Sequence, residues 1–148
     1  MWNFYFADDA PEKRSITIEF FESIDKGVYE IYIAQVVLDE IEEAPEPIRK
    51  QLIDLIRKYQ PVELGSTKEA ELLAKLYIDK GAIPAKKEED ALHVAIATVH
   101  EIDVLVTWNY KHLANVRKAE LLQSINLGEG YTKPLAITTP MGVMTDEN

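Results

Sequence analysis

The segment from Glu88 to Asn109 constrains the fold of this 148-residue chain more than any other. Its first part is apolar on nearly every side over residues 91–99, which predicts a buried helix rather than a surface helix. The apolar run Val104–Val106 follows and predicts a fully buried strand of a parallel sheet. A helix that feeds such a strand runs antiparallel to it. Asp90 and Asn109 should therefore reach the same edge of the sheet.

That edge is the carboxyl end of the strand, where open α/β sheets bind their ligands. Asp90, in the first turn of the expected helix, and Asn109, at the exit of the strand, are therefore candidate site residues. A structural explanation stays open for both of them. The helix macrodipole alone favours an aspartate in a first turn, and asparagine is a common turn residue after a strand.

Strand and helix patterns alternate along the rest of the chain. Short β-branched or apolar runs centred near residues 31, 62, 105 and 136 are separated by helical patterns, which predicts an α/β protein with a central parallel sheet flanked by helices. Four strands are few for so many helices, which indicates that one strand is missing from this chain. Besides Val104–Val106, the predicted strands are Glu30–Ile33, Pro61–Leu64 and Leu135–Thr138. Besides the helix that follows Glu88, the predicted helices run from the capping box Asp9–Glu12 to Gly27, over Gln35–Glu43, from Pro47 to Tyr59 and from the capping box Ser66–Glu69 to Gly81. The segment Tyr110–Ile125 is predicted to be partly helical.

Length and composition favour one soluble domain over residues 1–140, followed by a C-terminal tail at 141–148. The absence of cysteine excludes disulfides and thiolate metal sites. No apolar run is long enough to span a membrane, and no signal peptide is recognisable, so we expect a cytoplasmic protein. The net charge of −10 argues against a general nucleic-acid coat. Three local basic pairs, which are equally explained as solvated faces, are Lys86-Lys87, Lys111-His112 and Arg117-Lys118.

Three oxygen-bearing side chains are candidates for one metal site: Glu40, Asp90 and Asn109. Glu40 follows the first expected strand on a helix whose N-terminus lies at the carboxyl edge of the sheet. Carboxylate and carbonyl oxygens are the ligands that Mg²⁺ and Mn²⁺ prefer, and a cation would offset the repulsion between gathered acids. The alternatives are a solvated acidic face for Glu40 and a core position for His93, one turn after Asp90.

Three segments carry a resemblance to a known family. They are Ile33-Ala-Gln-Val-Val-Leu-Asp-Glu40-Ile, Glu89-Asp90-Ala-Leu-His-Val-Ala-Ile-Ala and Val104-Leu-Val-Thr-Trp-Asn109. In order, spacing and element type they resemble the PIN-domain family, and within it the VapC-type toxins of toxin–antitoxin pairs. The second and third segments together are fairly specific, whereas the glutamate segment alone is weak. The resemblance extends from about Trp2 to Thr139.

The resemblance implies a three-layer PIN-like fold and a Mg²⁺- or Mn²⁺-dependent endoribonuclease, with RNA as substrate and an antitoxin protein as partner. Glu40 and Asp90 match two of the metal-binding carboxylates of the family. Asn109 matches a position where many members have a further acid, so its contribution to metal binding should be weaker.

The N-terminus departs from the family pattern. Members open with a short apolar strand that ends in an aspartate, a principal metal ligand, whereas this sequence opens at Met1-Trp-Asn-Phe4, which resembles the segment after that strand. Asp8 and Asp9 do not align with the aspartate. We therefore expect a chain that lacks this strand and this carboxylate. Either the natural start lies upstream of Met1, or the protein is an inactive PIN-like protein-interaction module.

A sheet without its central strand would expose backbone groups and apolar surface on both flanking strands. We therefore expect the 148-residue chain to be poorly stable or to form a homodimer that covers the gap. Thermal denaturation combined with light scattering measures both properties. A cooperative melt of a monomer at high temperature would contradict this expectation.

Overall fold

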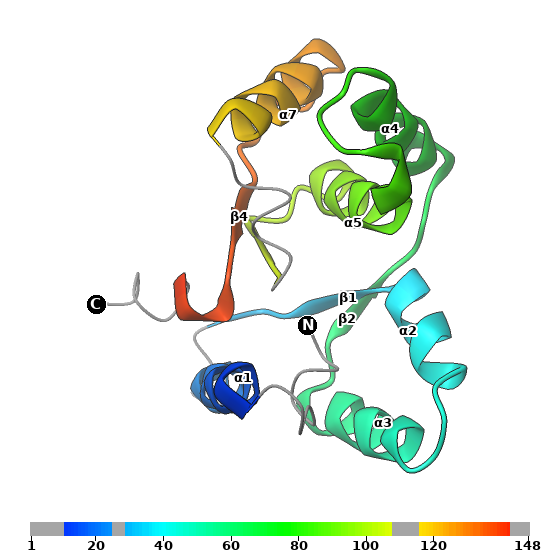
Figure 1. Cartoon of the computed structure of the whole chain (residues 1–148), viewed down its shortest axis with the longest axis vertical. Helices are drawn as coiled ribbons and strands as arrows, with labels where there is room; N and C mark the ends of the chain where they lie inside the picture. Colours follow the sequence, from blue (N-terminus) through cyan, green and yellow to red (C-terminus); the bar gives the residue numbers. More distant parts are fainter. Residues whose placement is uncertain (1–10, 25–28, 108–115, 143–148) are drawn as a thin grey trace. The chain divides into compact units, whose positions relative to one another are not determined.

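The computed structural model describes residues 11–24, 29–107 and 116–142. The chain divides into two compact units, and each is described by itself (Figure 1). The first unit comprises residues 1–65 together with 140–148, and the second comprises Ser66–Thr139. The single domain expected over residues 1–140 stays a prediction. Residues 140–142 are helical, and the last two of them belong to the tail expected at 141–148.

Helix α1 lies against α3 in the first unit through aromatic side chains. The rings of Phe21 and Tyr59 lie 5.1 Å apart between centroids, and Phe20 packs edge-on against Phe21. Phe21 is only 2% exposed, so this contact belongs to the interior of the unit. The described elements of the unit are α1 (Pro11–Ile24), β1 (Tyr32–Ala34), α2 (Gln35–Glu42), α3 (Ile48–Tyr59) and β2 (Val62–Leu64).

The core of the first unit lies between β1, α2 and α3. Ile33 of β1, Ile41 of α2 and Leu52 of α3 form one buried cluster. Half-buried apolar residues from both helices surround it, because each helix repeats apolar residues at a spacing of three or four. β1 and β2 pair in parallel, with Tyr32 opposite Val62. This pairing needs a crossover, which α2 and α3 supply.

A close pair of helices, α4 (Lys68–Asp79) and α5 (Glu88–Val99), forms the interior of the second unit (Figure 1). Both helices bury residues at spacings of three, four and seven, and the alanines among them let two helix backbones approach closely. The buried positions are Ala70, Leu73, Ala74 and Tyr77 in α4 and Ala91, Val94, Ala95, Ile96, Ala97 and Thr98 in α5. The short 3₁₀ helix η2 (Ala85–Lys87) precedes α5, and β3 (Val104–Val106), α7 (Val116–Gly128) and β4 (Ala136–Thr138) complete the described elements.

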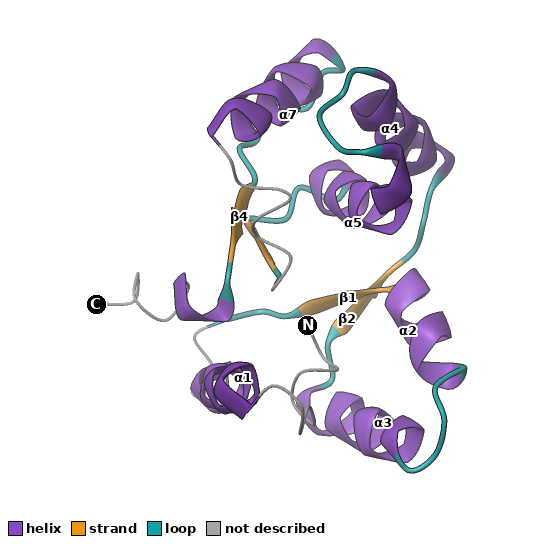
Figure 2. Cartoon of the chain, viewed as in Figure 1, coloured by secondary structure: helices purple, strands orange, loops and turns teal. Residues whose placement is uncertain are grey.

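The strands are parallel as expected, but among the described residues they form two sheets of two strands each. β1 pairs with β2 in the first unit, and β3 pairs with β4 in the second, with Val104 opposite Ala136. Figure 2 shows how small the strand content is beside the helices. The fold is therefore α/β and mostly helical. The single central sheet is not seen in the described part of the chain.

Two sequence-based expectations about local structure were wrong. β3 is not fully buried, since Val104 is 39% exposed and Leu105 and Val106 are half-buried. Among the described residues β3 pairs with one strand only, β4. A strand in the middle of a sheet, with a strand on each side and helices on both faces, would be covered more completely. The cap of α4 is Thr67 rather than Ser66. The Thr67 hydroxyl accepts a hydrogen bond from the backbone N–H of Ala70 at 3.1 Å.

The other predicted elements are confirmed to within a few residues where they are described. The predicted cap Asp9, the predicted stop Gly27 and the start of the segment 110–125 lie outside the described residues. No helix among residues 11–24, 29–107 and 116–142 is long and apolar enough to span a membrane.

The cap of α4 supports a direct prediction. Thr67→Ala removes the acceptor for the Ala70 N–H and should lower the free energy of unfolding by about 1 kcal/mol. Ser66→Ala, one residue earlier and exposed, is the matched control and should change it little. Urea denaturation followed by circular dichroism measures both. Equal losses for the two variants would contradict the assignment of the cap.

Candidate functional site

Asp90 lies in the first turn of α5, where the structure confirms the helix that the sequence predicts. Its side chain is half-buried, whereas the neighbouring Glu88 and Glu89 are exposed. Lys87, at the N-cap position, makes no side-chain cap hydrogen bond. The helix macrodipole favours a carboxylate in the first turn. Asp90 is therefore a partly shielded carboxylate at a position that suits one.

A short reversal connects α5 to β3. Four residues, His100–Asp103, separate the helix from the strand, and Glu101 adopts a left-handed conformation with a φ of 56°. The backbone N–H of Ile102 donates to the carbonyl of Ala97 at 2.9 Å, which closes the helix end. This reversal supports the expected antiparallel course of helix and strand, and so a position for Asp90 towards the carboxyl end of β3.

Glu40 lies in the first unit, on α2, which begins directly at the carboxyl end of β1. Its side chain is exposed, and so are the carboxylates of Asp39, Glu42 and Glu43 nearby. Ile41 between them is buried and anchors the helix to the core of the unit. Glu40 itself lies beyond the first turn of α2, six residues after the end of β1, so its role at the carboxyl edge stays a prediction. The dense run of exposed acids agrees with the alternative, a solvated acidic face.

The predicted three-residue site is only partly described. Asn109 lies outside the described residues, and Glu40 and Asp90 belong to different units. Their union in one site therefore stays a prediction. Within the described ranges, no group of three or more His, Cys, Asp or Glu side chains is placed to hold a metal ion. The donor chemistry of Glu40 and Asp90 suits a hard cation, but a complete site would need donors beyond those that the described residues bring together.

His93 lies on α5 one turn after Asp90. Burial lowers the pKa of His93, and the carboxylates of Asp90 and Glu89 oppose that shift. The Nε2 atom of the ring is shielded from solvent and has no hydrogen-bond partner among the described residues. His93 is therefore held neutral in the folded protein, beside a carboxylate.

The structure also reveals a buried polar cluster that sequence reasoning missed. The Tyr77 hydroxyl donates to Asn126 Oδ1 at 2.5 Å and lies 3.3 Å from Thr98 Oγ1. The Thr98 hydroxyl itself donates to the carbonyl of Val94 at 2.9 Å. Burial raises the pKa of Tyr77 to about 12, and the hydrogen bonds to Thr98 and Asn126 oppose the rise. Tyr77 is fully buried, so the cluster joins α4, α5 and α7 instead of facing a ligand.

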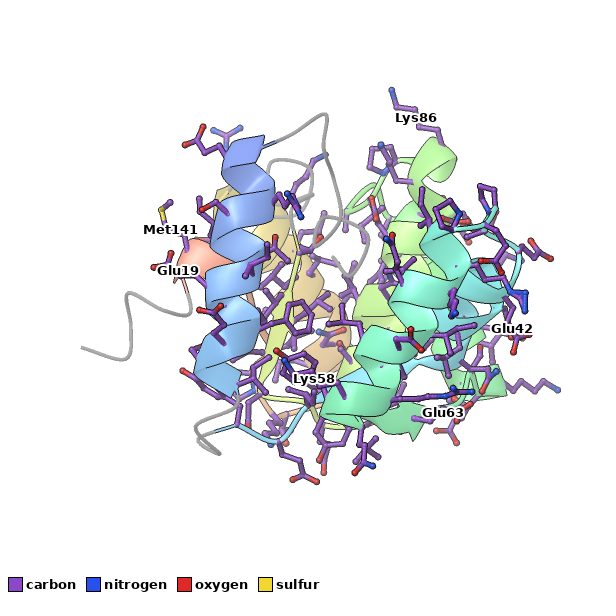
Figure 3. The ribbon with its side chains drawn as sticks, turned by 90° about the horizontal axis from the view of Figure 1, so that it is seen from below. Glu19, Glu42, Lys58, Glu63, Lys86 and Met141 are labelled. Carbon is purple, nitrogen blue, oxygen red and sulfur yellow. The ribbon has the colours of Figure 1, made fainter. Side chains whose placement is uncertain are left out.

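A second feature that the sequence patterns did not predict is a group of cationic residues on α3. The prediction for this segment used only the spacing of its apolar residues. The helix carries four cationic residues and one acid in a chain of net charge −10. The signal in the sequence is the Arg-Lys pair at 49–50 repeated at 57–58, eight residues later. Of the three basic pairs that the sequence suggested, Lys111-His112 lies outside the described residues. Lys86 is exposed on η2 (Figure 3), and Arg117 is exposed on α7.

Comparison of the chain with protein-family models, with curated proteins and with solved structures found no match. The resemblance to the PIN-domain family therefore rests on the three sequence segments that carry it.

The lowered pKa of His93 predicts how stability depends on pH. The unfolded chain binds a proton at His93 near pH 6.5 and the folded chain does not, so His93 destabilises the fold as pH falls through and below 6.5. His93→Gln removes this contribution. As the pH is lowered from 7.5 to 5.5, the wild type should therefore lose more unfolding free energy than His93→Gln does. Urea denaturation across that range measures it, and a difference that does not vary with pH would contradict the burial of a neutral histidine.

Proposed function

We propose that this protein is a PIN-like, divalent-metal-dependent endoribonuclease, the toxin of a toxin–antitoxin pair. The observation that carries the proposal is the half-buried Asp90 in the first turn of α5, a largely buried helix that leads by a short reversal into a parallel strand. A partly shielded carboxylate held there by helix packing is suited to binding a hard cation. The sequence around it is also the more specific part of the family resemblance.

Glu40 supplies the second support. Glu40 lies on the helix that follows β1, and Asp90 lies on the helix that precedes β3. Both strands belong to parallel pairs. Ligand sites of α/β proteins lie at the carboxyl ends of parallel strands. In the proposal, Glu40 and Asp90 are metal ligands, and Asn109, outside the described residues, positions a metal-bound water or the RNA.

The cation would be Mg²⁺ or Mn²⁺, which activates water and offsets the charge that develops on a phosphodiester. What the described residues contribute is narrower. Asp90 provides a carboxylate whose position is fixed by helix packing, and Glu40 provides an exposed, adaptable one. Neither brings enough donors alone, so we expect weak metal binding and weak cleavage by this chain. The antitoxin and a second copy of the chain remain the proposed protein partners.

The second candidate is a non-catalytic PIN-like interaction module. Asn109 favours this second candidate. Many members of the family have an acid at the matching position, and an amide oxygen binds a divalent cation less strongly than a carboxylate does. The two candidates differ in whether a cation binds at all and in whether RNA is cut.

The test is a paired set of charge-neutralising variants of the full chain. Asp90→Asn and Glu40→Gln should each abolish Mn²⁺-dependent cleavage of a fluorescently labelled RNA and weaken Mn²⁺ binding in calorimetry at least tenfold, since each removes a ligand charge. The matched controls are Glu89→Gln, on the same turn as Asp90, and Glu42→Gln, an exposed residue of the same helix as Glu40 (Figure 3). Both controls should behave like the wild type.

Two results would argue against the enzyme. Mn²⁺-dependent cleavage that survives Asp90→Asn would remove Asp90 from the site. A wild-type chain that neither binds Mn²⁺ nor cuts RNA, while remaining folded by circular dichroism, would favour the interaction module.

A further inference from the structure

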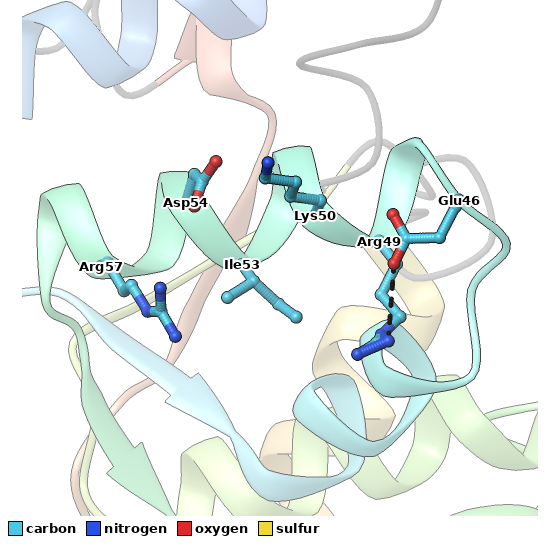
Figure 4. A pocket seen from close by; sticks show the side chains of 6 residues that line it. All are labelled: Glu46, Arg49, Lys50, Ile53, Asp54 and Arg57. Atoms are coloured by element: carbon cyan, nitrogen blue, oxygen red, sulfur yellow. Dashed lines mark hydrogen bonds and ion pairs between the residues drawn. The ribbon is translucent and has the colours of Figure 1, made fainter.

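Helix α3 borders a surface hollow lined by three cationic residues, two acidic residues and one apolar residue. Glu46, Arg49, Lys50, Ile53, Asp54 and Arg57 surround it (Figure 4). We call Arg49, Lys50 and Arg57 the basic face. Lys50 and Arg57 are exposed, and the side chain of Arg49 is 43% exposed. The opposite side of the helix, with Leu52 and Leu55, is buried in the core of the first unit. The fold thus holds the basic face outward.

These cations are weakly neutralised within the described part of the protein. Lys50 and Arg57 make no ion pair there, although Asp54 lies within one helical turn of each. Arg49 pairs with Glu46 only at 3.5 Å, and its Nε atom, shielded from solvent, has no hydrogen-bond partner among the described residues. The exposed ammonium of Lys50 and guanidinium of Arg57 can contact an anion from solvent. The basic face is therefore available to an external anion.

We propose that the basic face binds the phosphodiester backbone of single-stranded RNA. The identity of the anion as RNA rests on the proposed function, whereas the basic face itself rests on α3 alone. Guanidinium groups bind phosphate oxygens through two parallel hydrogen bonds, and ammonium groups bind them as point charges. In an acidic chain, a local cluster of this kind is the place where a polyanion can approach without repulsion.

The spacing of the cations fits a chain of phosphates better than a single anion. Lys50 and Arg57 are seven residues apart, about 10 Å along a helix axis that rises about 1.5 Å per residue. Successive phosphates of a stacked strand advance about 3.4 Å, so the two side chains meet different phosphates. Two cations at this spacing along one helix face can each contact a separate phosphate of an extended strand.

The lining also favours RNA over an acidic protein. Protein–protein interfaces are built around buried apolar or aromatic side chains, and charged residues are infrequent at their centre. Here five of the six lining residues are charged, and the one apolar residue, Ile53, is already half-buried in the core of its own unit. A protein partner would find no apolar anchor in this hollow, whereas a phosphate backbone needs none.

The experiment measures the binding of a fluorescein-labelled 20-nucleotide single-stranded RNA to the full chain by anisotropy, in EDTA so that no cleavage occurs. Salt is varied to obtain the slope of log affinity against log salt concentration. Lys50→Gln/Arg57→Gln should weaken binding at least tenfold and reduce the slope by about 0.7 for each lost phosphate contact. Asp54→Asn, which removes the carboxylate from the hollow, should tighten binding.

The matched control is Lys75→Gln/Lys80→Gln, which removes two exposed charges from α4 and the residue after it. It should bind RNA with the affinity and slope of the wild type. Wild-type affinity in the Lys50→Gln/Arg57→Gln variant would overturn the proposal, as would an Asp54→Asn variant with unchanged binding. Displacement of the RNA by poly-glutamate at equal charge concentration would assign the face to an acidic protein and would also overturn it.

Cleavage in Mn²⁺ is measured in parallel so that the two proposals fail separately. If the wild type cuts RNA and Lys50→Gln/Arg57→Gln binds and cuts it equally well, the ribonuclease stands and the basic face does not. If no variant cuts RNA but the expected pattern of binding is found, the basic face stands and the ribonuclease does not.

Discussion

The second unit depends on the close contact between α4 and α5. Buried alanines at 70, 74, 91 and 95 let the two helices approach, and the full burial of Tyr77 in this interior brings a hydroxyl out of water. A buried hydroxyl without a partner costs about 1–3 kcal/mol, so its hydrogen bond to Asn126 of α7 is a condition for the packing. The same contact fixes α5, and with it the position of Asp90. The candidate site residue is thus positioned by the packing of its own helix.

Charge is distributed unevenly in the first unit, and this has a physical consequence. α2 exposes a run of acids, whereas the neighbouring α3 exposes the basic face, and both helices are anchored by the same apolar cluster. Neither surface is required by the core, since the buried positions of both helices are apolar. Solvation alone would accept either sign on either helix. The acids of α2 and the cations of α3 are therefore surface features that the core leaves open, and the proposals of a cation at Glu40 and of RNA at the basic face concern these two surfaces.

Local structure was largely predictable from the sequence, and the candidate site was predictable only in its parts. The helices α3 and α5 follow from apolar periodicity, and β1 to β4 follow from short β-branched runs, because these signals depend on neighbours within one or two turns. The cap of α4 was misplaced by one residue because Ser66 and Thr67 are chemically equivalent caps, and only the backbone conformation chooses between them. The Tyr77 cluster was missed because its members are separated by 21 and 49 positions.

The sequence by itself determined the type and order of the elements, the parallel sense of the strands and the presence of acids beside strands β1 and β3. These properties are encoded in spacings of two to four residues, and no distant contact needs to be known. Only the tertiary structure decided that the described strands pair two by two, that β3 stays partly exposed and that the basic residues of α3 face outward. Strand pairing and burial depend on which distant segments meet. That choice is set by the sum of many packing contacts, and no local pattern specifies it.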